Sequence, residues 1–111
     1  MPPRFLGEFE QMVLLATLQL KENANAVAIL RELDERAGRS VSRGTLYKTL
    51  ERMEAKGLVV WEAEEGPPER GGHPRRLFRV TGHGIRALQE SREALLRLWD
   101  GLEKAVGESE S

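Results

Sequence analysis

Apolar residues recur at intervals of three and four along the first half of the chain. The segment Gly7–Leu20 has this periodicity, with additional leucines that widen the apolar stripe, and so predicts a helix buried on more than one side. A second helix is predicted over Asn25–Ala37, with Asn25 as its N-cap and Gly38 as its C-terminal stop. The residues of this second helix that we expect to face the core are Val27, Ile29, Leu30 and Leu33.

A third helix is predicted to begin after Ser42, which can cap it, and to end at Gly57. Three apolar residues fall on one face of this helix, namely Leu46, Leu50 and Met53. The opposite face carries polar and basic side chains. The third helix is therefore expected to bury one face and to present the other to solvent or to a partner.

Two strand-like segments follow the third helix, Leu58–Glu64 and Arg75–Val80. The segment between them, Glu65–Pro74, is rich in glycine and proline and predicts a turn. A helix that leads into a hairpin with a basic tip is the arrangement of a recognition helix and its wing. We therefore expect a winged helix-turn-helix, in which the outward face of the recognition helix enters the major groove of DNA.

Thr81 can cap a final helix over Gly82–Val106, which is long for a domain of this size. Its apolar seam follows a 7-4-3-4 spacing, close to a heptad repeat, and consists of Leu88, Leu95, Trp99, Leu102 and Val106. Three helices and a wing cannot cover this seam, so we expect a second subunit to cover it. Trp99 either packs in that dimer interface or presents a flat wall to a planar ligand.

The sequence thus predicts a mainly α fold with a small β-hairpin: a winged helix-turn-helix followed by a long C-terminal dimerisation helix. The winged helix-turn-helix, as DNA-binding domain, would span residues 1–81 and the dimerisation helix residues 82–106. Residues 107–111 would form a short frayed tail.

Charge along the chain is segregated, although the net charge is only −1. Between Arg39 and Lys56 five cations stand against two acids, and between Glu69 and Arg86 five cations stand against one. The position of the charges, rather than their sum, decides whether a nucleic acid can bind. The two basic segments are the predicted recognition helix and wing, which favours contact with DNA.

The candidate DNA-binding residues form two groups. Those of the third helix are Ser42, Arg43, Thr45, Lys48, Thr49 and Arg52. Those of the wing are Arg70, Gly71, Gly72, Arg75 and Arg76, where glycines let the backbone come close to a sugar-phosphate strand. Two alternatives stay open: a solvated charged face, and a winged-helix module whose basic face binds an acidic protein instead of DNA.

Enzyme chemistry is not indicated. The chain has no cysteine, its two histidines are not at metal-ligand spacing, and no nucleophile–base arrangement accompanies its glutamates. We expect no catalytic residues, no metal and no cofactor. The apolar run Met12–Leu20 is too short for a membrane span of about 20 residues. The lack of cysteine fits a cytoplasmic protein.

The motifs resemble those of the PadR family of bacterial transcriptional regulators. The resemblance runs from about Leu6 to Val106 and rests on five short matches. These are Leu6-Gly-Glu-Phe-Glu10, Gly44-Thr-Leu-Tyr-Lys-Thr-Leu50, Lys56-Gly-Leu58, Arg70-Gly-Gly72 and Arg79-Val-Thr-Gly-His-Gly84. The absence of any further segment after the last helix is similar to the short subgroup of the family, which has a single dimerisation helix.

The resemblance implies a winged-helix homodimer that represses transcription by binding a palindromic operator on double-stranded DNA. It also implies that Tyr47 and the Gly71-Gly72 wing lie near DNA. The resemblance further implies that a small molecule often releases the repressor. Some members bind planar aromatic molecules at the dimer interface against a tryptophan of the last helix, and Trp99 stands where such a tryptophan would be.

Overall fold

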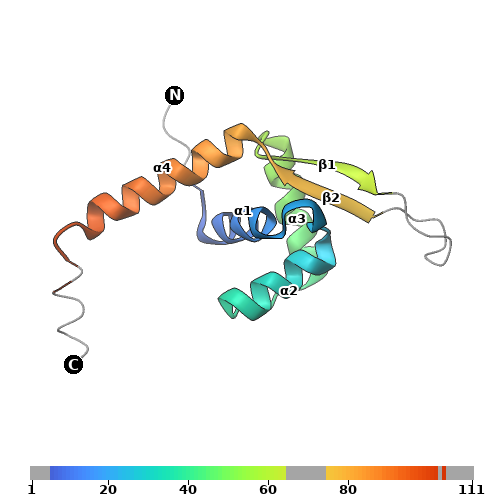
Figure 1. Cartoon of the computed structure of the whole chain (residues 1–111), viewed down its shortest axis with the longest axis horizontal. Coiled ribbons are helices and arrows are strands. Elements are labelled where there is room, and N and C mark those ends of the chain that lie inside the picture. The colour runs from blue at the N-terminus through green and yellow to red at the C-terminus, as the bar shows by residue number, and fades with distance from the viewer. Residues whose placement is uncertain (1–5, 65–74, 103, 105–111) are drawn as a thin grey trace.

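The computed structural model describes residues 6–64, 75–102 and 104. Three helices form a compact body, a two-stranded hairpin lies against it, and the last helix extends past α1 and away from the hairpin (Figure 1). The helices are α1 (Glu8–Leu20), α2 (Ala26–Ala37), α3 (Arg43–Ala55) and α4 (Gly82–Trp99), with a 3₁₀ turn η1 (Lys21–Asn23) after α1. The strands are β1 (Val59–Glu64) and β2 (Arg75–Val80). This arrangement confirms the predicted winged-helix fold.

The core lies where the three helices and the hairpin meet. Its side chains come from the helix positions that the apolar periodicity selected, and each of the following is completely buried: Val13, Leu14, Ile29, Leu46 and Met53. Burying one such side chain stabilises the fold by roughly 1.5–3 kcal/mol. Val27 is an exception, because its side chain is 43% exposed although the sequence pattern placed it inward.

Side-chain caps set three of the helix starts, as the sequence predicted. Asn25 Oδ1 accepts a hydrogen bond from the Ala28 amide at 2.9 Å, and Ser42 Oγ accepts one from the Thr45 amide at 3.1 Å. Thr81 Oγ1 does the same for α4, at 3.0 Å from the Gly84 amide. Each cap satisfies an otherwise unpaired amide and contributes typically about 1 kcal/mol.

The hairpin is antiparallel, with Val59 opposite Val80 and Trp61 opposite Phe78. Val59 and Phe78 are buried and anchor the hairpin on the helical body. The Phe78 amide also donates a hydrogen bond to the Ala24 carbonyl at 2.9 Å. The wing is therefore fixed at its root to the connection between α1 and α2.

The start of α4 is locked onto the turn that follows α3. The Thr81 hydroxyl donates to the Gly57 carbonyl at 2.7 Å, and the Thr81 amide donates to the Leu58 carbonyl at 3.0 Å. Gly84 is buried against the same carbonyl: a Cβ there would overlap the Leu58 oxygen and come within 2.7 Å of Val80 Cγ1. The direction of α4 is thereby tied to the end of α3.

The last helix ends earlier than predicted. Its regular part stops at Trp99 instead of Val106, because Asp100 leaves helical geometry and Gly101 takes a left-handed conformation with φ +81°. Leu102 lies in the turn beyond, and Val106 lies outside the described residues. Leu88, predicted as an interface residue, is 9% exposed and belongs to the core of the single chain.

Two glycines in the first turn of α4 give a matched test of this junction. Gly84→Ala should destabilise the fold by about 1–3 kcal/mol, because the added methyl meets backbone that cannot move freely. Gly82→Ala should leave stability unchanged or raise it by roughly 0.5–1 kcal/mol, because nothing lies near its Cβ and alanine favours a helix. Thermal or urea unfolding of both variants measures the difference, and equal stabilities would show that the junction is loose.

Candidate nucleic-acid interface

The first turns of α3 present the polar face that the sequence predicted. Arg43, Thr45 and Lys48 are exposed, while Leu46 on the opposite face is completely buried. The Ser42 hydroxyl caps the helix and donates to Thr45 Oγ1 at 2.9 Å. The buried leucine face fixes the rotation of α3, so that the basic side chains point away from the core.

A hollow of about 600 Å³ lies between the start of α2, the start of α3 and the start of β2. Its lining residues are Asn25, Ala26, Val27, Arg43, Tyr47, Glu51, Arg75 and Arg76. The hollow therefore combines three arginines with the N-terminus of α2, whose first amides carry partial positive charge. Glu51 is the one acidic side chain among these residues. Such a surface suits an anion.

Several arginines of the described part of the chain are held in ion pairs, whereas those that line the hollow are not. Arg39 pairs with Glu8, Arg52 with Glu10 and Arg79 with Glu62, at N–O distances of 3.1, 3.3 and 2.9 Å. Within the same residues Arg43, Arg75 and Arg76 have no carboxylate partner, and all three line the hollow. Their guanidinium groups can therefore bind an external anion without first breaking an ion pair.

Glu10 ties α1 to the far end of α3. Its carboxylate is 8% exposed, accepts from the Gly7 amide at 3.0 Å, and pairs with Arg52 at 3.3 Å and Lys56 at 3.2 Å. Burial alone raises the pKa of this carboxyl, but the Gly7 amide and the two cations outweigh burial, so the pKa lies below 4.5. Glu10 is ionised at neutral pH and holds α3 in place. The sequence signal for it was an acid three residues after a helix cap.

Two of the predicted DNA-binding residues are engaged inside the protein. Thr49 is 3% exposed, and its hydroxyl donates to the Thr45 carbonyl at 3.1 Å, so its side chain is not available to a ligand. Arg52 is exposed, yet its guanidinium is directed at Glu10 on α1. Sequence spacing placed Arg52 on the outward face correctly but could not reveal the acid, which is 42 residues away along the chain.

The wing contributes the start of β2, at the outer end of the hairpin, to the described surface. Arg75 and Arg76 open β2, and the Arg76 guanidinium lies 4.4 Å from the centre of the Trp61 ring. The predicted contacts Arg70, Gly71 and Gly72 lie outside the described residues. They stay predictions.

An apolar groove of about 480 Å³ runs between α1 and α4. Its apolar lining includes Leu15, Leu18, Ile85, Leu88, Leu95, Leu96 and Trp99. Most of these side chains are unusually exposed for their size, for example Leu95 at 51% and Trp99 at 45%. A contiguous apolar surface of this kind on a small chain marks a binding or association face. No described helix has the length and apolar character needed to cross a membrane.

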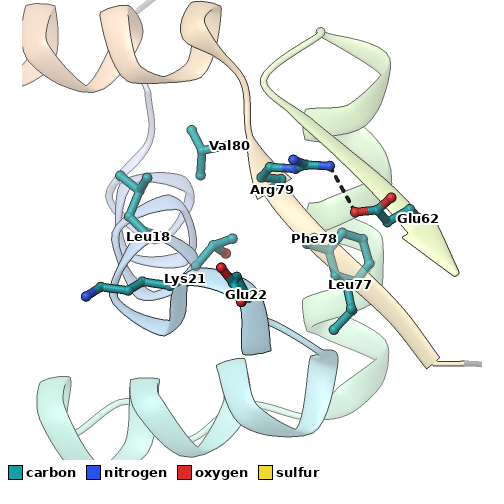
Figure 2. Close-up of a pocket in the computed structure, with 9 residues that line it drawn as sticks. Leu18, Lys21, Glu22, Glu62, Leu77, Phe78, Arg79 and Val80 are labelled. Atoms are coloured by element: carbon teal, nitrogen blue, oxygen red, sulfur yellow. Dashed lines mark hydrogen bonds and ion pairs between the residues drawn. The ribbon is translucent and has the colours of Figure 1, made fainter. Parts of the chain in front are cut away.

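A further hollow of about 400 Å³ lies between the end of α1 and the hairpin. Figure 2 shows Leu18 and Val80 on its two sides, with the Arg79–Glu62 ion pair at its edge. The Thr17 hydroxyl in its lining donates a hydrogen bond to the Val13 carbonyl at 2.7 Å and is thereby engaged. Residues 6–64, 75–102 and 104 contain no cluster of histidine and acidic side chains that could hold a metal. This hollow offers no catalytic arrangement.

Comparisons with known proteins agree on one group. Residues 14–90 match the model of the family described as "Transcriptional regulator PadR-like family". A curated relative, transcriptional regulator Rv3488 of Mycobacterium tuberculosis, is 48% identical over 63 residues. That alignment covers 57% of this chain and only 55% of the relative.

Two solved structures are similar over nearly the whole chain. A PadR family transcriptional regulator from Eggerthella lenta superposes with a TM-score of 0.67 at 32% identity, covering 89% of this chain and 86% of the other. A PadR-like transcription factor from Bacteroides fragilis gives a TM-score of 0.63 at 33% identity, covering 90% and 87%.

The Glu10 cluster generates a prediction for the pH dependence of stability. Because the folded-state pKa is depressed, the stabilisation from Glu10 is fully present above its ordinary pKa of 4.5 and is lost as pH falls through the lower folded value. Glu10→Gln should cost roughly 1–3 kcal/mol at neutral pH and should lose less stability than the wild type on acidification.

The matched control is Glu8→Gln, two residues earlier on the same helix, whose side chain is 76% exposed. It should change stability by at most about 0–1 kcal/mol, as exposed ion pairs do. Urea unfolding across the acid range measures both variants. Equal acid sensitivity of Glu10→Gln and wild type would contradict the assignment.

Proposed function

The chain belongs to the PadR-like family of transcriptional regulators, and from this premise we propose that it is a homodimeric repressor that binds an inverted-repeat operator. As a member of this family it is a DNA-binding regulator of transcription and not an enzyme. The observation that supports the finer proposal most strongly is the hollow where the starts of α2 and α3 meet three arginines that have no carboxylate partner among the described residues.

In the proposed complex the start of α3 enters the major groove. Thr45 and Lys48 are the exposed side chains placed to reach base edges, and Arg43 at the first position of α3 reaches a guanine edge or a phosphate. Arg75 and Tyr47 line the hollow beside α3 and meet the sugar-phosphate strand. A DNA target also accords with the cytoplasmic location expected from the sequence.

The occupant we propose for the α1–α4 groove is the same groove of a second copy. The leucines Leu15, Leu95 and Leu96 are left exposed by the other residues that the structure describes. Two copies related by a two-fold axis would cover both grooves at once, since such an interface is self-complementary. Symmetric pairing would also place two copies of α3 for two half-sites of one operator.

Trp99 supports the proposal that a small aromatic molecule releases the repressor. It lines the groove and is half exposed, so its indole can either pack against the partner or stack on a flat ligand. A ligand regulates DNA binding only if it prefers one dimer geometry over another. If an aromatic compound quenches the fluorescence of Trp99 without changing the affinity for DNA, Trp99 has a packing role only.

DNA binding can be tested before the operator is known, because phosphate contacts are independent of sequence. The protein should bind a mixed-sequence duplex at low salt, with affinity falling steeply as salt rises. Arg75→Ala should weaken binding and reduce the slope of log affinity against log salt by about 0.9, the value for one released counterion.

Arg31→Ala is the control, since Arg31 is exposed on α2 and lines none of the described hollows. It should leave both affinity and slope unchanged in a fluorescence-anisotropy titration. Loss of affinity in Arg31→Ala alone, or wild-type affinity that is insensitive to salt, would favour the protein-interaction module over a DNA-binding regulator.

Association can be tested with two leucines on the same helix. Leu95→Glu should give a folded monomer, because Leu95 lines the groove and a carboxylate buried without a partner costs several kcal/mol in the dimer. Leu98→Glu should remain dimeric, since Leu98 is 74% exposed and does not line the groove. Light scattering gives the mass of each variant, and a dimeric Leu95→Glu would place the interface elsewhere.

A further inference from the structure

Trp61 is more exposed than its neighbours on the inward face of the wing. Its neighbours on that face, Val59 and Val80, are buried, as is Phe78 directly opposite. Trp61 itself remains 37% exposed. The ring carries the guanidinium of Arg76 at 4.4 Å from its centre, within the range of a cation–π contact. The indole therefore lies outside the buried core and holds a basic side chain.

The way in which Trp61 holds Arg76 differs from the way other arginines are held. Arg79 and Arg52 meet carboxylates through their N–H groups, so those donors are already used. A stacked guanidinium uses its flat face, while its five N–H donors lie at the edge. In the part of the chain that the structure describes, Arg76 makes no hydrogen bond or ion pair. The stack orders Arg76 and leaves its donors available.

The location of the stack links it to the proposed DNA surface. Arg76 lines the same hollow as Arg43 and Tyr47, although Trp61 does not line it. A phosphate in this hollow would meet the edge of a guanidinium whose face is already supported. A free arginine would have to give up its rotamer freedom on binding, whereas a stacked one has lost part of it beforehand.

We propose that Trp61 is a positioning residue for DNA binding, which holds the Arg76 guanidinium by its face so that its N–H edge receives a backbone phosphate. The inference rests on the proposed function and adds to it a residue that does not itself touch DNA. It predicts coupling: Trp61 matters for DNA affinity only while Arg76 is present.

The experiment is a double-mutant cycle on binding to a mixed-sequence duplex at low salt, with Trp61→Leu, Arg76→Ala and the double variant. Trp61→Leu should weaken DNA binding about 2–5-fold. This is the loss of affinity expected when an exposed cation–π contact is removed. In the Arg76→Ala background the same substitution should have no further effect. Arg76→Ala should also lower the salt slope by about 0.9, whereas Trp61→Leu should leave it unchanged.

Two further variants separate positioning from packing. Trp61→Phe keeps an aromatic face and should bind DNA with intermediate affinity, even if Trp61→Leu disturbs the wing. Val60→Ala is the matched control, because Val60 is 48% exposed and points to the other face of β1. It should leave DNA affinity unchanged. Thermal unfolding of each variant establishes that the fold is retained.

The outcomes distinguish this inference from the proposed function. Wild-type protein that binds DNA, with Trp61→Leu equally damaging in both backgrounds, would make Trp61 a packing residue and overturn the inference alone. The same holds if Trp61→Leu has no effect. Failure of the wild type to bind any duplex would overturn the proposed function, and the inference with it.

Discussion

The close approach of Gly84 to the Leu58 carbonyl sets where α4 begins relative to the end of α3. Leu58 lies in the short connection between α3 and β1, and Gly84 lies in the first turn of α4, so the contact joins the segment after one helix to the start of another. Thr81 adds hydrogen bonds to the Gly57 and Leu58 carbonyls. The side chain missing at Gly84 allows this approach. A change in the direction of α4 must therefore move α3 as well.

Because of this constraint, the proposed dimer would set the position of α3 as well as that of α4. The α1–α4 groove is apolar and the surface at the start of α3 is basic, and one rigid unit carries both. Glu10 strengthens that unit by fastening α1 to α3 through Arg52 and Lys56. Under the proposed function, pairing of two grooves fixes the separation of two recognition helices, and a ligand in the groove acts by altering it.

A net charge of −1 does not describe the electrostatics of this molecule. Several arginines, such as Arg39 and Arg79, are neutralised by carboxylates on neighbouring elements. Among the described residues, the arginines around the hollow have no carboxylate partner. One of them, Arg76, lies over the indole ring of Trp61. The distinction between engaged and available cations, more than their number, makes one face of the protein suited to DNA.

Local signals in the sequence predicted most of the fold, since caps such as Asn25, Ser42 and Thr81 act within one helical turn. The errors arose where distant segments meet. Spacing alone did not reveal that the core of the same chain buries Leu88; because Leu88 also lines the α1–α4 groove, its place in a dimer interface stays a prediction. The engagement of Arg52 by Glu10 and the stacking of Arg76 on Trp61 depend on tertiary contacts that no local pattern encodes. The end of α4 at Trp99 was missed because the apolar spacing continues past Gly101, whose left-handed conformation does not belong to a helix.

The proposed homodimer requires that its two recognition helices bind DNA together. Selection of bound sequences from a random duplex library tests this most directly. If the proposed dimer forms, an inverted repeat is enriched. Its half-sites are separated by about one helical turn of 10–10.5 base pairs or by a multiple of that turn. Enrichment of a single unrepeated half-site, or no enrichment of any sequence, would contradict it.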